Sequence, residues 1–274
     1  FQVADQPEIT IECNPDDLDG DYLMKLKQIA DFRINLGVQS FINLELQFLN
    51  RRHTAEQSLD ILEKLFDLGF QNVGIDLIYA LPKSDLKSLA FNLETAFKFP
   101  VKHLSAYHLT FEEGTPFNQQ LKNREIEEVS EDLSRELYFY LIKKTSEHGF
   151  EQYEISNFAK NNFYSKHNTS YWQGIPYLGV GPSAHSFNGK ERHWNSTDIK
   201  KYLQYIEKGE LACEEEQLTM KDRFNEYLMV SLRTKWGANL EYLQSSFSPF
   251  VGTGFKEKLK YYRNKALIYQ DNKH

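Results

Sequence analysis

Alternating apolar and polar positions mark four short segments in the first half of the chain. Between them, apolar residues recur at the spacing of a helix with one buried face. The alternating segments predict strands over residues 8–14, 33–40, 72–81 and 102–110. The helical spacing predicts helices over residues 16–30, 44–49, 54–68, 84–98 and 129–148. Strands that alternate with helices predict a parallel sheet covered by helices, either as a barrel or as a doubly wound fold.

The two faces of the first three predicted strands differ in polarity, because successive side chains of a strand point to opposite faces. One face is apolar, whereas the other carries Glu12, Gln39 and Asp76. A doubly wound sheet buries both faces in apolar contacts, so the polar face favours a barrel whose interior holds a polar ligand. A satisfied polar network inside the barrel is the alternative. In the fourth strand the pattern leaves open which residues face inward.

The second half of the chain predicts a strand at residues 153–159 and a helix at 198–208. Three helices at 219–234, 240–247 and 254–265 then precede an apolar strand at the C-terminus, an order typical of a winged-helix module. We interpret the acidic run at 211–217 as a linker, and therefore expect domains at 1–210 and 211–274. Because the chain starts without methionine and stops inside an apparent hairpin, we expect it to be part of a longer protein.

Composition narrows the classes of function. The formal net charge is −7 and no basic cluster stands out, which argues against nucleic-acid binding. No apolar run approaches the roughly 18–20 residues of a membrane span, and no secretory signal opens the chain. Cys13 and Cys213 are far apart and form no CxxC pair. Sparse cysteine fits a reducing compartment, so we expect a cytoplasmic protein.

The segment 164–185 concentrates histidines, aromatic rings and glycines. At helical spacing, His167 and Tyr171 share one face, and Asn168 and Trp172 share the adjacent one. Flat rings beside an axial ligand suit a porphyrin, and His167 is the candidate iron ligand. The alternative is a capped turn with a hydrogen-bonded histidine. His185, further along, is expected to be structural.

Two other motifs have both a functional and a structural interpretation. In NRRHT (50–54), Arg51 precedes a helix that Thr54 caps, and an arginine there could pair with a ligand carboxylate or with a neighbouring helix. In IDLIYALP (75–82), Ile78 shares the face of Asp76 and would cover an adenine ring or simply belong to the core.

Nine motifs occur in an order that resembles one family: ITIECNP, RINLGVQSF, NRRHT, IDLIYALP, LSAYHLT, GTPF, YEISNFA, HNTSYW and YLGVGPSAHSF. Together they resemble radical S-adenosylmethionine proteins related to oxygen-independent coproporphyrinogen III oxidase. HNxxYW is the motif that distinguishes the haem chaperone branch, the HemW type. The resemblance implies an incomplete (β/α)6 barrel, TIM-like, with a C-terminal α-helical domain.

The resemblance also implies binding residues. The positions that match S-adenosylmethionine ligands in the family are Glu12, Gln39, Arg51, Asp76, Ile78 and Thr110. The positions that match the haem-associated motif are His167, Asn168, Tyr171 and Trp172. The expected cargo is haem, and the expected partners are haem-accepting proteins.

The family's CxxxCxxC motif, which holds a 4Fe-4S cluster, and its GGGTP turn do not occur in the 274 residues. We expect both upstream of Glu8, and we expect this chain alone to carry no cluster and no radical activity. The sheet edge left open would be available to a second copy. The expected function is a haem chaperone that delivers haem. The alternative is the oxidase, which converts coproporphyrinogen III to protoporphyrinogen IX by oxidative decarboxylation.

Overall fold

The computed structural model describes residue 5 and residues 7–270 of the chain. The chain divides into two compact units, Phe1–Ser165 and Lys166–His274. The domain boundary expected at residues 210 and 211 lies inside the second unit and stays a prediction. Of the predicted terminal strand, residues 267–270 have no strand conformation, and residues 271–274 lie outside the described residues.

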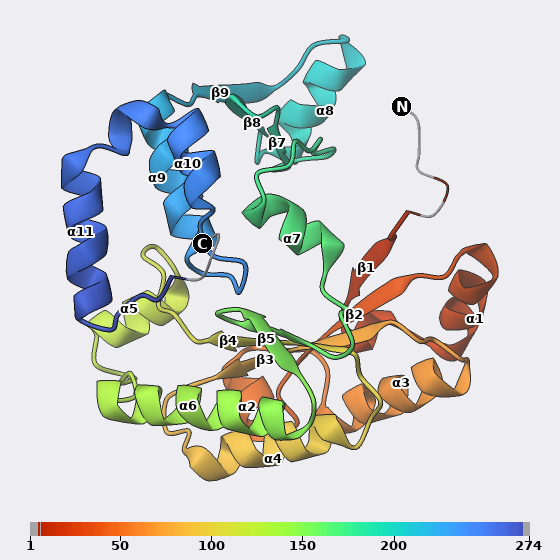
Figure 1. Ribbon diagram of the computed structural model, residues 1–274. Helices are drawn as coiled ribbons and strands as arrows, with labels where there is room; N and C mark the ends of the chain where they lie inside the picture. Colours follow the sequence, from red (N-terminus) through yellow and green to blue (C-terminus); the bar gives the residue numbers. More distant parts are fainter. Residues whose placement is uncertain (1–4, 6, 271–274) are drawn as a thin grey trace. The chain divides into compact units, whose positions relative to one another are not determined.

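A mainly parallel sheet forms the centre of the first unit (Figure 1). Its strand order is β1-β2-β3-β4-β6-β5. The parallel strands are β1 (Thr10–Cys13), β2 (Arg33–Gln39), β3 (Val73–Tyr79) and β4 (His103–His108). An antiparallel hairpin of β5 (Glu151–Glu154) and β6 (Asn157–Ala159) extends the sheet beyond β4. The predicted α/β class with a parallel sheet is confirmed, but the single strand expected at 153–159 is wrong, because a turn at residues 155 and 156 reverses the chain.

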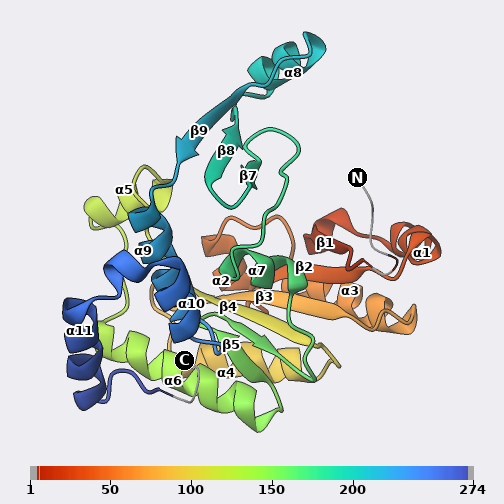
Figure 2. The ribbon, with the colours of Figure 1, turned by 45° about the horizontal axis from the view of Figure 1, so that its top comes forward.

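Helices connect these strands, and α3, α4 and α6 lie along one face of the sheet (Figures 1 and 2). The bounds are η1 (Pro15–Asp17), α1 (Gly20–Ile29), α2 (Asn43–Phe48), α3 (Ala55–Asp67), α4 (Leu86–Phe97), α5 (Pro116–Lys122) and α6 (Glu131–Glu147). Thr54 begins α3 as predicted: its side chain accepts a hydrogen bond from the backbone of Gln57, whose side chain accepts one in return. Gly69 follows the last turn of α3 and adopts a positive φ of 78°, a conformation that glycine allows at the end of a helix.

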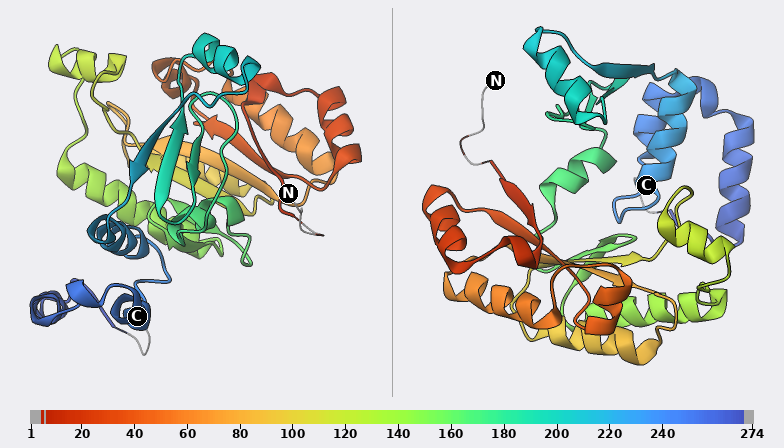
Figure 3. Two further views of the ribbon diagram at one scale, coloured as in Figure 1. Left: turned by 90° about the horizontal axis from the view of Figure 1, so that it is seen from above. Right: turned by 180° about the vertical axis from the view of Figure 1, so that it is seen from behind.

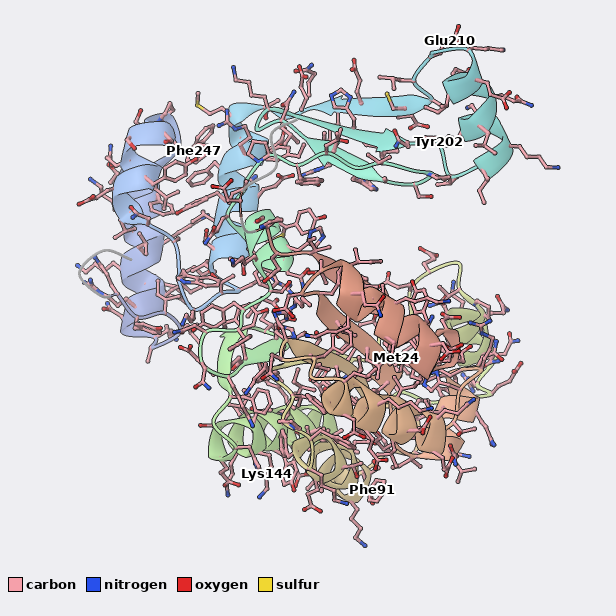
Figure 4. All side chains as sticks on the ribbon, turned by 90° about the vertical axis from the view of Figure 1, so that its right-hand side faces the viewer. Met24, Phe91, Lys144, Tyr202, Glu210 and Phe247 are labelled. Atoms are coloured by element: carbon pink, nitrogen blue, oxygen red, sulfur yellow. The ribbon has the colours of Figure 1, made fainter. Side chains whose placement is uncertain are left out.

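The core of the first unit lies between the sheet and these helices. Ile34 and Leu36 on β2 and Val73 and Ile75 on β3 are all fully buried against the helices. Phe91, on the opposite side of α4, is 51% exposed (Figure 4). The apolar face that the alternation predicted is therefore the face that packs on the helices, and the polar face points the other way.

The second unit is built around a short antiparallel sheet in the order β7-β8-β9. Its elements are α7 (Lys166–Trp172), β7 (His185–Phe187), β8 (Glu191–Asn195), α8 (Ile199–Glu207), β9 (Cys213–Gln217), α9 (Met220–Ser231), α10 (Leu240–Ser246), η2 (Ser248–Phe250) and α11 (Thr253–Asn264). Helix α8 connects β8 to β9 (Figure 3, cyan). The last three helices enclose an apolar cluster around Phe224, Leu243 and Phe247.

The acidic run expected as a linker is instead strand β9, which pairs with β8 along its length. Arg192 on β8 lies 3.4 Å from the carboxylate of Glu216 on β9 and forms a bidentate pair with Glu226. The positive charge of Arg192 on β8 offsets negative charge on β9, and such cross-strand pairs allow an acidic segment to join a sheet. Within the described residues, no helix is long and apolar enough to cross a membrane.

Candidate functional site

The register of the parallel strands brings a row of polar side chains together on the face of the sheet opposite α3, α4 and α6 (Figure 1). Glu12 on β1 lies beside Asn35 on β2. Asn35 lies beside Gly74 on β3, which in turn lies beside His103 on β4. Asp76 is two positions beyond Gly74 and therefore on the same face. The two predicted acidic residues, Glu12 and Asp76, thus share one face of the sheet.

Asp76 is held by its neighbour on β2. Nδ2 of Asn35 donates a hydrogen bond to Oδ2 of Asp76 over 2.7 Å. Burial raises the pKa of Asp76, and hydrogen bonds from Ser105 and Asn35 act in the opposite direction. Oδ1 of Asp76 is buried and accepts no hydrogen bond from any residue that the structure describes. That oxygen can accept a hydrogen bond from a ligand hydroxyl.

Gln39 reaches the same face although β2 ends irregularly. The register shifts between Leu36 and Gln39, and the φ of Gln39 is 65°. A Cβ atom on Gly37 would lie only 2.9 Å from Nε2 of Gln39 and 3.4 Å from Oδ1 of Asn14. Glycine at position 37 therefore leaves the space that the buried Gln39 side chain occupies.

The other three residues that the resemblance assigned to S-adenosylmethionine lie on separate elements. Ile78 is half-buried on β3, on the face of Asp76. Arg51 follows α2 and is exposed, whereas the next residue, Arg52, pairs with both aspartates of η1 at 2.7 and 2.9 Å. Thr110 follows β4 and is exposed. For the NRRHT motif, the structural interpretation of an arginine bonded to a neighbouring helix therefore applies to Arg52.

A cavity of about 540 Å³ adjoins the carboxyl ends of β3 and β4 beside the start of α6. Thr110 lines it, but the acidic residues of the polar face do not. Both ring nitrogens of the lining residue His108 are engaged, Nδ1 with the carbonyl oxygen of Leu109 and Nε2 with the hydroxyl of Ser134, each at 2.8 Å. This cavity is therefore separate from the row around Asp76.

A buried polar group next to that row was not identified from the sequence. The hydroxyl of Tyr153, a fully buried residue, lies 2.6 Å from Nε2 of His103 and accepts a hydrogen bond from the backbone of Ser165. Burial lowers the pKa of His103 well below its ordinary value, so the imidazole is neutral. Arg33, only 2% exposed, donates to the carbonyl oxygen of Phe163, and burial lowers its pKa.

These residues could have been found from strand parity. Arg33 and Asn35 alternate with the apolar residues of β2, and His103 alternates with the apolar residues of β4. The pattern of β4 left its parity open because Ser105, Tyr107, His108 and Thr110 are spread over both faces.

Several buried atoms on this face have no hydrogen-bond partner in the described part of the chain. They are Oγ1 of Thr10, Oδ1 of Asn35, Oδ1 of Asp76, Nδ1 of His103 and Oδ1 of Asn157. Two of them, on Asn35 and His103, flank Gly74: a Cβ built there would lie 2.8 and 3.4 Å from them. Unsatisfied buried polar atoms beside a carboxylate fit a polar ligand that carries several donors and acceptors.

The haem-associated motif forms helix α7 in the second unit. The hydroxyl of Tyr171 lies 3.0 Å from Nε2 of His167, and the two rings meet edge to face with centroids 4.9 Å apart. Tyr171 also meets Tyr177 edge to face at 4.6 Å, and Tyr177 lies 6.1 Å from Phe187 on β7. The expected shared face of His167 and Tyr171 is therefore present. His185 on β7 stacks on Trp194 on β8, with ring centroids 6.1 Å apart.

The predicted site residues thus divide between the units. Six lie in the first unit, while His167, Asn168, Tyr171 and Trp172 lie in the second. Among the residues that the structure describes, no group of three or more histidine, cysteine, aspartate or glutamate side chains is placed to hold a metal ion.

Comparison with known proteins adds the family. A sequence model described as the Radical SAM superfamily matches residues 3–93. A protein named "Heme chaperone HemW" from Lactococcus lactis is 33% identical over 264 residues, covering 96% of this chain and 69% of that protein. The protein of the same name from Bacillus subtilis is 32% identical over 267 residues, with 97% and 70% covered.

A solved structure is also similar: coproporphyrinogen III oxidase (HemN) from Escherichia coli, a radical SAM enzyme. Its TM-score is 0.76 at 24% identity, and the match covers 97% of this chain and 65% of that one. At this identity the likeness concerns the fold alone. The chain spans about 70% of the length of the two curated relatives.

Proposed function

The chain belongs to the HemW haem chaperone family within the radical SAM superfamily, and from this premise we propose that it binds haem through α7 and S-adenosylmethionine through the polar face of its sheet. The observation that carries the proposal is the HNTSYW helix, in which His167 and Tyr171 form a hydrogen-bonded pair on one face. Delivery of the haem to haem-accepting proteins is the role that follows.

The polar face of the sheet has the chemistry that S-adenosylmethionine requires. Acidic side chains such as Asp76 and Glu12 can accept hydrogen bonds from ribose hydroxyls and attract the positive charges of the sulfonium and ammonium groups. Gln39 offers an amide for hydrogen bonds, and Ile78 offers an apolar surface for the adenine ring. Arg51 can pair with the carboxylate of S-adenosylmethionine. The unsatisfied atoms on the same face support this assignment, because a bound ligand would satisfy them.

A 4Fe-4S cluster, which in radical SAM proteins supplies the electron for reductive cleavage of S-adenosylmethionine, needs three cysteine ligands. The chain has only Cys13 and Cys213, and these do not fit that ligand set. We therefore assign no step of the function to a cluster held by these residues.

Haem binding is tested by titrating the protein with ferric haem and following its absorption. We expect saturable binding, and a loss of affinity when His167 and Tyr171 are both replaced by alanine. Tyr269→Ala is the control, because Tyr269 is 87% exposed in another part of the unit. Failure of the unaltered protein to bind haem, or unchanged affinity in the double variant, would contradict the proposal.

The alternative function is oxidative decarboxylation of coproporphyrinogen III. The similarity of fold to a coproporphyrinogen III oxidase supports it, although only at the level of fold. The discriminating assay is anaerobic product formation by the full gene product after cluster reconstitution. Turnover would favour the oxidase, and retention of haem without turnover would favour the chaperone.

Finer features of the architecture are also part of the proposal. The sheet would belong to an incomplete (β/α)6 barrel within residues 1–210, followed by a winged-helix-like domain at 211–274. The three helices α9, α10 and α11 around one apolar cluster support the second assignment. Strand β1 is the edge of the described sheet, which supports pairing with a second copy there. We place the protein in the cytoplasm, where its bacterial relatives would meet haem-requiring partners.

A further inference from the structure

The end of strand β2 is bent so that the amide of Gln39 lies on the polar face of the sheet. The register shifts after Leu36, and Gln39 pairs with Leu77, a core residue of β3. In a regular strand that pairing would turn the side chain of Gln39 toward the helices. Its φ of 65° turns the side chain back, and Nε2 lies over Gly37 on the polar face, 2.9 Å from a Cβ built there.

The turn that follows Gln39 is bonded to Asn92, in the middle of α4. Oδ1 of Asn92 accepts a hydrogen bond from the backbone of Phe41 over 2.6 Å, and its Nδ2 donates one to Oε2 of Glu45 on α2 over 3.0 Å. The hydroxyl of Ser40 donates to the same carboxylate oxygen. A left-handed backbone at a residue with a Cβ persists only where the surroundings hold it, and these bonds do so on one side of Gln39.

A second buried side chain holds the other side of Gln39. The carbonyl oxygen of Val38 accepts hydrogen bonds from Nε2 of His53 over 3.0 Å and from the backbone of Ser40 over 2.8 Å. His53 is 3% exposed. The backbone on both sides of Gln39 is therefore fixed by buried partners.

The place of Asn92 in its helix shows that its amide has a specific task. It lies between the core residues Leu89 and Leu93 and is only 4% exposed. A buried amide destabilises the fold unless its hydrogen bonds are made, and both groups of Asn92 make theirs at the turn after Gln39. An apolar side chain at position 92 would leave the backbone N–H of Phe41 without this acceptor.

Resting on the proposed S-adenosylmethionine site, we propose that Asn92 is a positioning residue of that site, acting from the helix side of the sheet. By holding the turn at Phe41, it keeps Gln39 left-handed, with its amide on the face that carries Asp76. A side chain already held in its binding conformation loses little freedom when a ligand arrives, so this network raises the affinity for S-adenosylmethionine.

The test measures binding of S-adenosylmethionine to the full gene product by equilibrium dialysis. Asn92→Ala is expected to raise the Kd about tenfold, equivalent to about 1.4 kcal/mol. Leu93→Ala is the matched control, because Leu93 is the next residue of the same helix and is 1% exposed. Leu93→Ala should lower the stability of the fold but leave the Kd unchanged. Circular dichroism verifies that each variant is folded.

A double-mutant cycle separates positioning from a general loss of stability. If Asn92 acts through Gln39, Asn92→Ala should have no further effect on the Kd in a Gln39→Ala background.

A second variant tests the same bonds without removing the side chain. Asn92→Asp keeps an acceptor for Phe41 but sets a second carboxylate against Glu45, so it should also weaken binding. Adding Glu45→Gln returns an amide to the pair and should restore the affinity.

Each of four results would overturn the assignment: an unchanged Kd in folded Asn92→Ala, an equal loss of affinity in Leu93→Ala, the same effect of Asn92→Ala in both backgrounds of the cycle, or no recovery when Glu45→Gln is added to Asn92→Asp. A failure of the proposed function differs from all of them, because the unaltered protein would then bind no S-adenosylmethionine.

Discussion

Replacing Gly74 by alanine is expected to destabilise the first unit by displacing a side chain on the neighbouring strand. The new Cβ atom would lie 2.8 Å from Oδ1 of Asn35, closer than side-chain contacts allow, and 3.2 Å from Cβ of His103. Asn35 must then move, and its 2.7 Å hydrogen bond to Asp76 is lost or lengthened.

Two opposing contributions determine how much Gly74→Ala changes the free energy of unfolding. A hydrogen bond to a charged group contributes about 1.5–3 kcal/mol to the free energy of unfolding. Alanine in place of glycine inside a strand stabilises by about 0.5–1 kcal/mol, because the unfolded chain has less freedom to lose. The net destabilisation expected for Gly74→Ala is therefore about 0.5–2.5 kcal/mol.

The assay is urea unfolding at neutral pH, with a double-mutant cycle between Gly74→Ala and Asn35→Ala. Without the Asn35 amide the new methyl group has little to displace, so Gly74→Ala should then be neutral or stabilising. Gly20→Ala is the control, because nothing lies within 4 Å of a Cβ built at position 20. Equal effects of Gly74→Ala in both backgrounds would refute the reasoning.

Three further predictions concern buried groups. Asp76→Asn should raise the free energy of unfolding at pH 7, because burial raises the pKa of Asp76 and so disfavours the charged form in the folded state. The extra stability of Asp76→Asn should vanish as the pH falls through that raised pKa toward the ordinary carboxyl value of about 3.9. If the free energies of unfolding of the variant and the unaltered protein instead ran parallel with pH, the prediction would be contradicted. Tyr153→Phe should cost about 1–3 kcal/mol in urea unfolding through lost buried hydrogen bonds, against about 0.5 kcal/mol or less for the exposed Tyr22→Phe; equal costs would count against the buried network. Leu62→Ala, in the fully buried core, should lower the free energy of unfolding by about 2–5 kcal/mol. A loss as small as that caused by Leu44→Ala, at an exposed position, would show that α3 does not pack on the sheet as described.

Much of the local structure followed from residues close together in the sequence. The cap at Thr54, the glycine after α3 and the bounds of α2, α3, α4 and α6 agree with prediction to within a few residues. The helix expected at 16–30 is divided into η1 and α1, and α5 was not predicted. The two-residue alternation also assigned the face of Asp76 correctly relative to the apolar core of β3. Such features depend on backbone geometry within one or two turns, which is why a single sequence contains them.

The failures have a common cause. The strand β9 was taken for a linker because its glutamates suggest a solvated segment, and only pairing with β8 makes it a strand. The strands β7 and β8 were not predicted at all, since each is short and lacks a clear alternation. Strand propensity is weak where cross-strand neighbours decide the outcome.

The candidate site shows the same division between what the sequence alone determined and what required the tertiary structure. The candidate residues of the polar face, such as Asp76, and separately those of the α7 motif, such as Tyr171, were proposed from motifs in order along the chain, and the same motifs indicated the family. The bond between Asn35 and Asp76 joins residues 41 positions apart, and that between His103 and Tyr153 joins residues 50 apart. The order and register of the strands create such contacts, and burial then shifts the pKa values of the groups involved. Both depend on which distant segments the folded chain brings together.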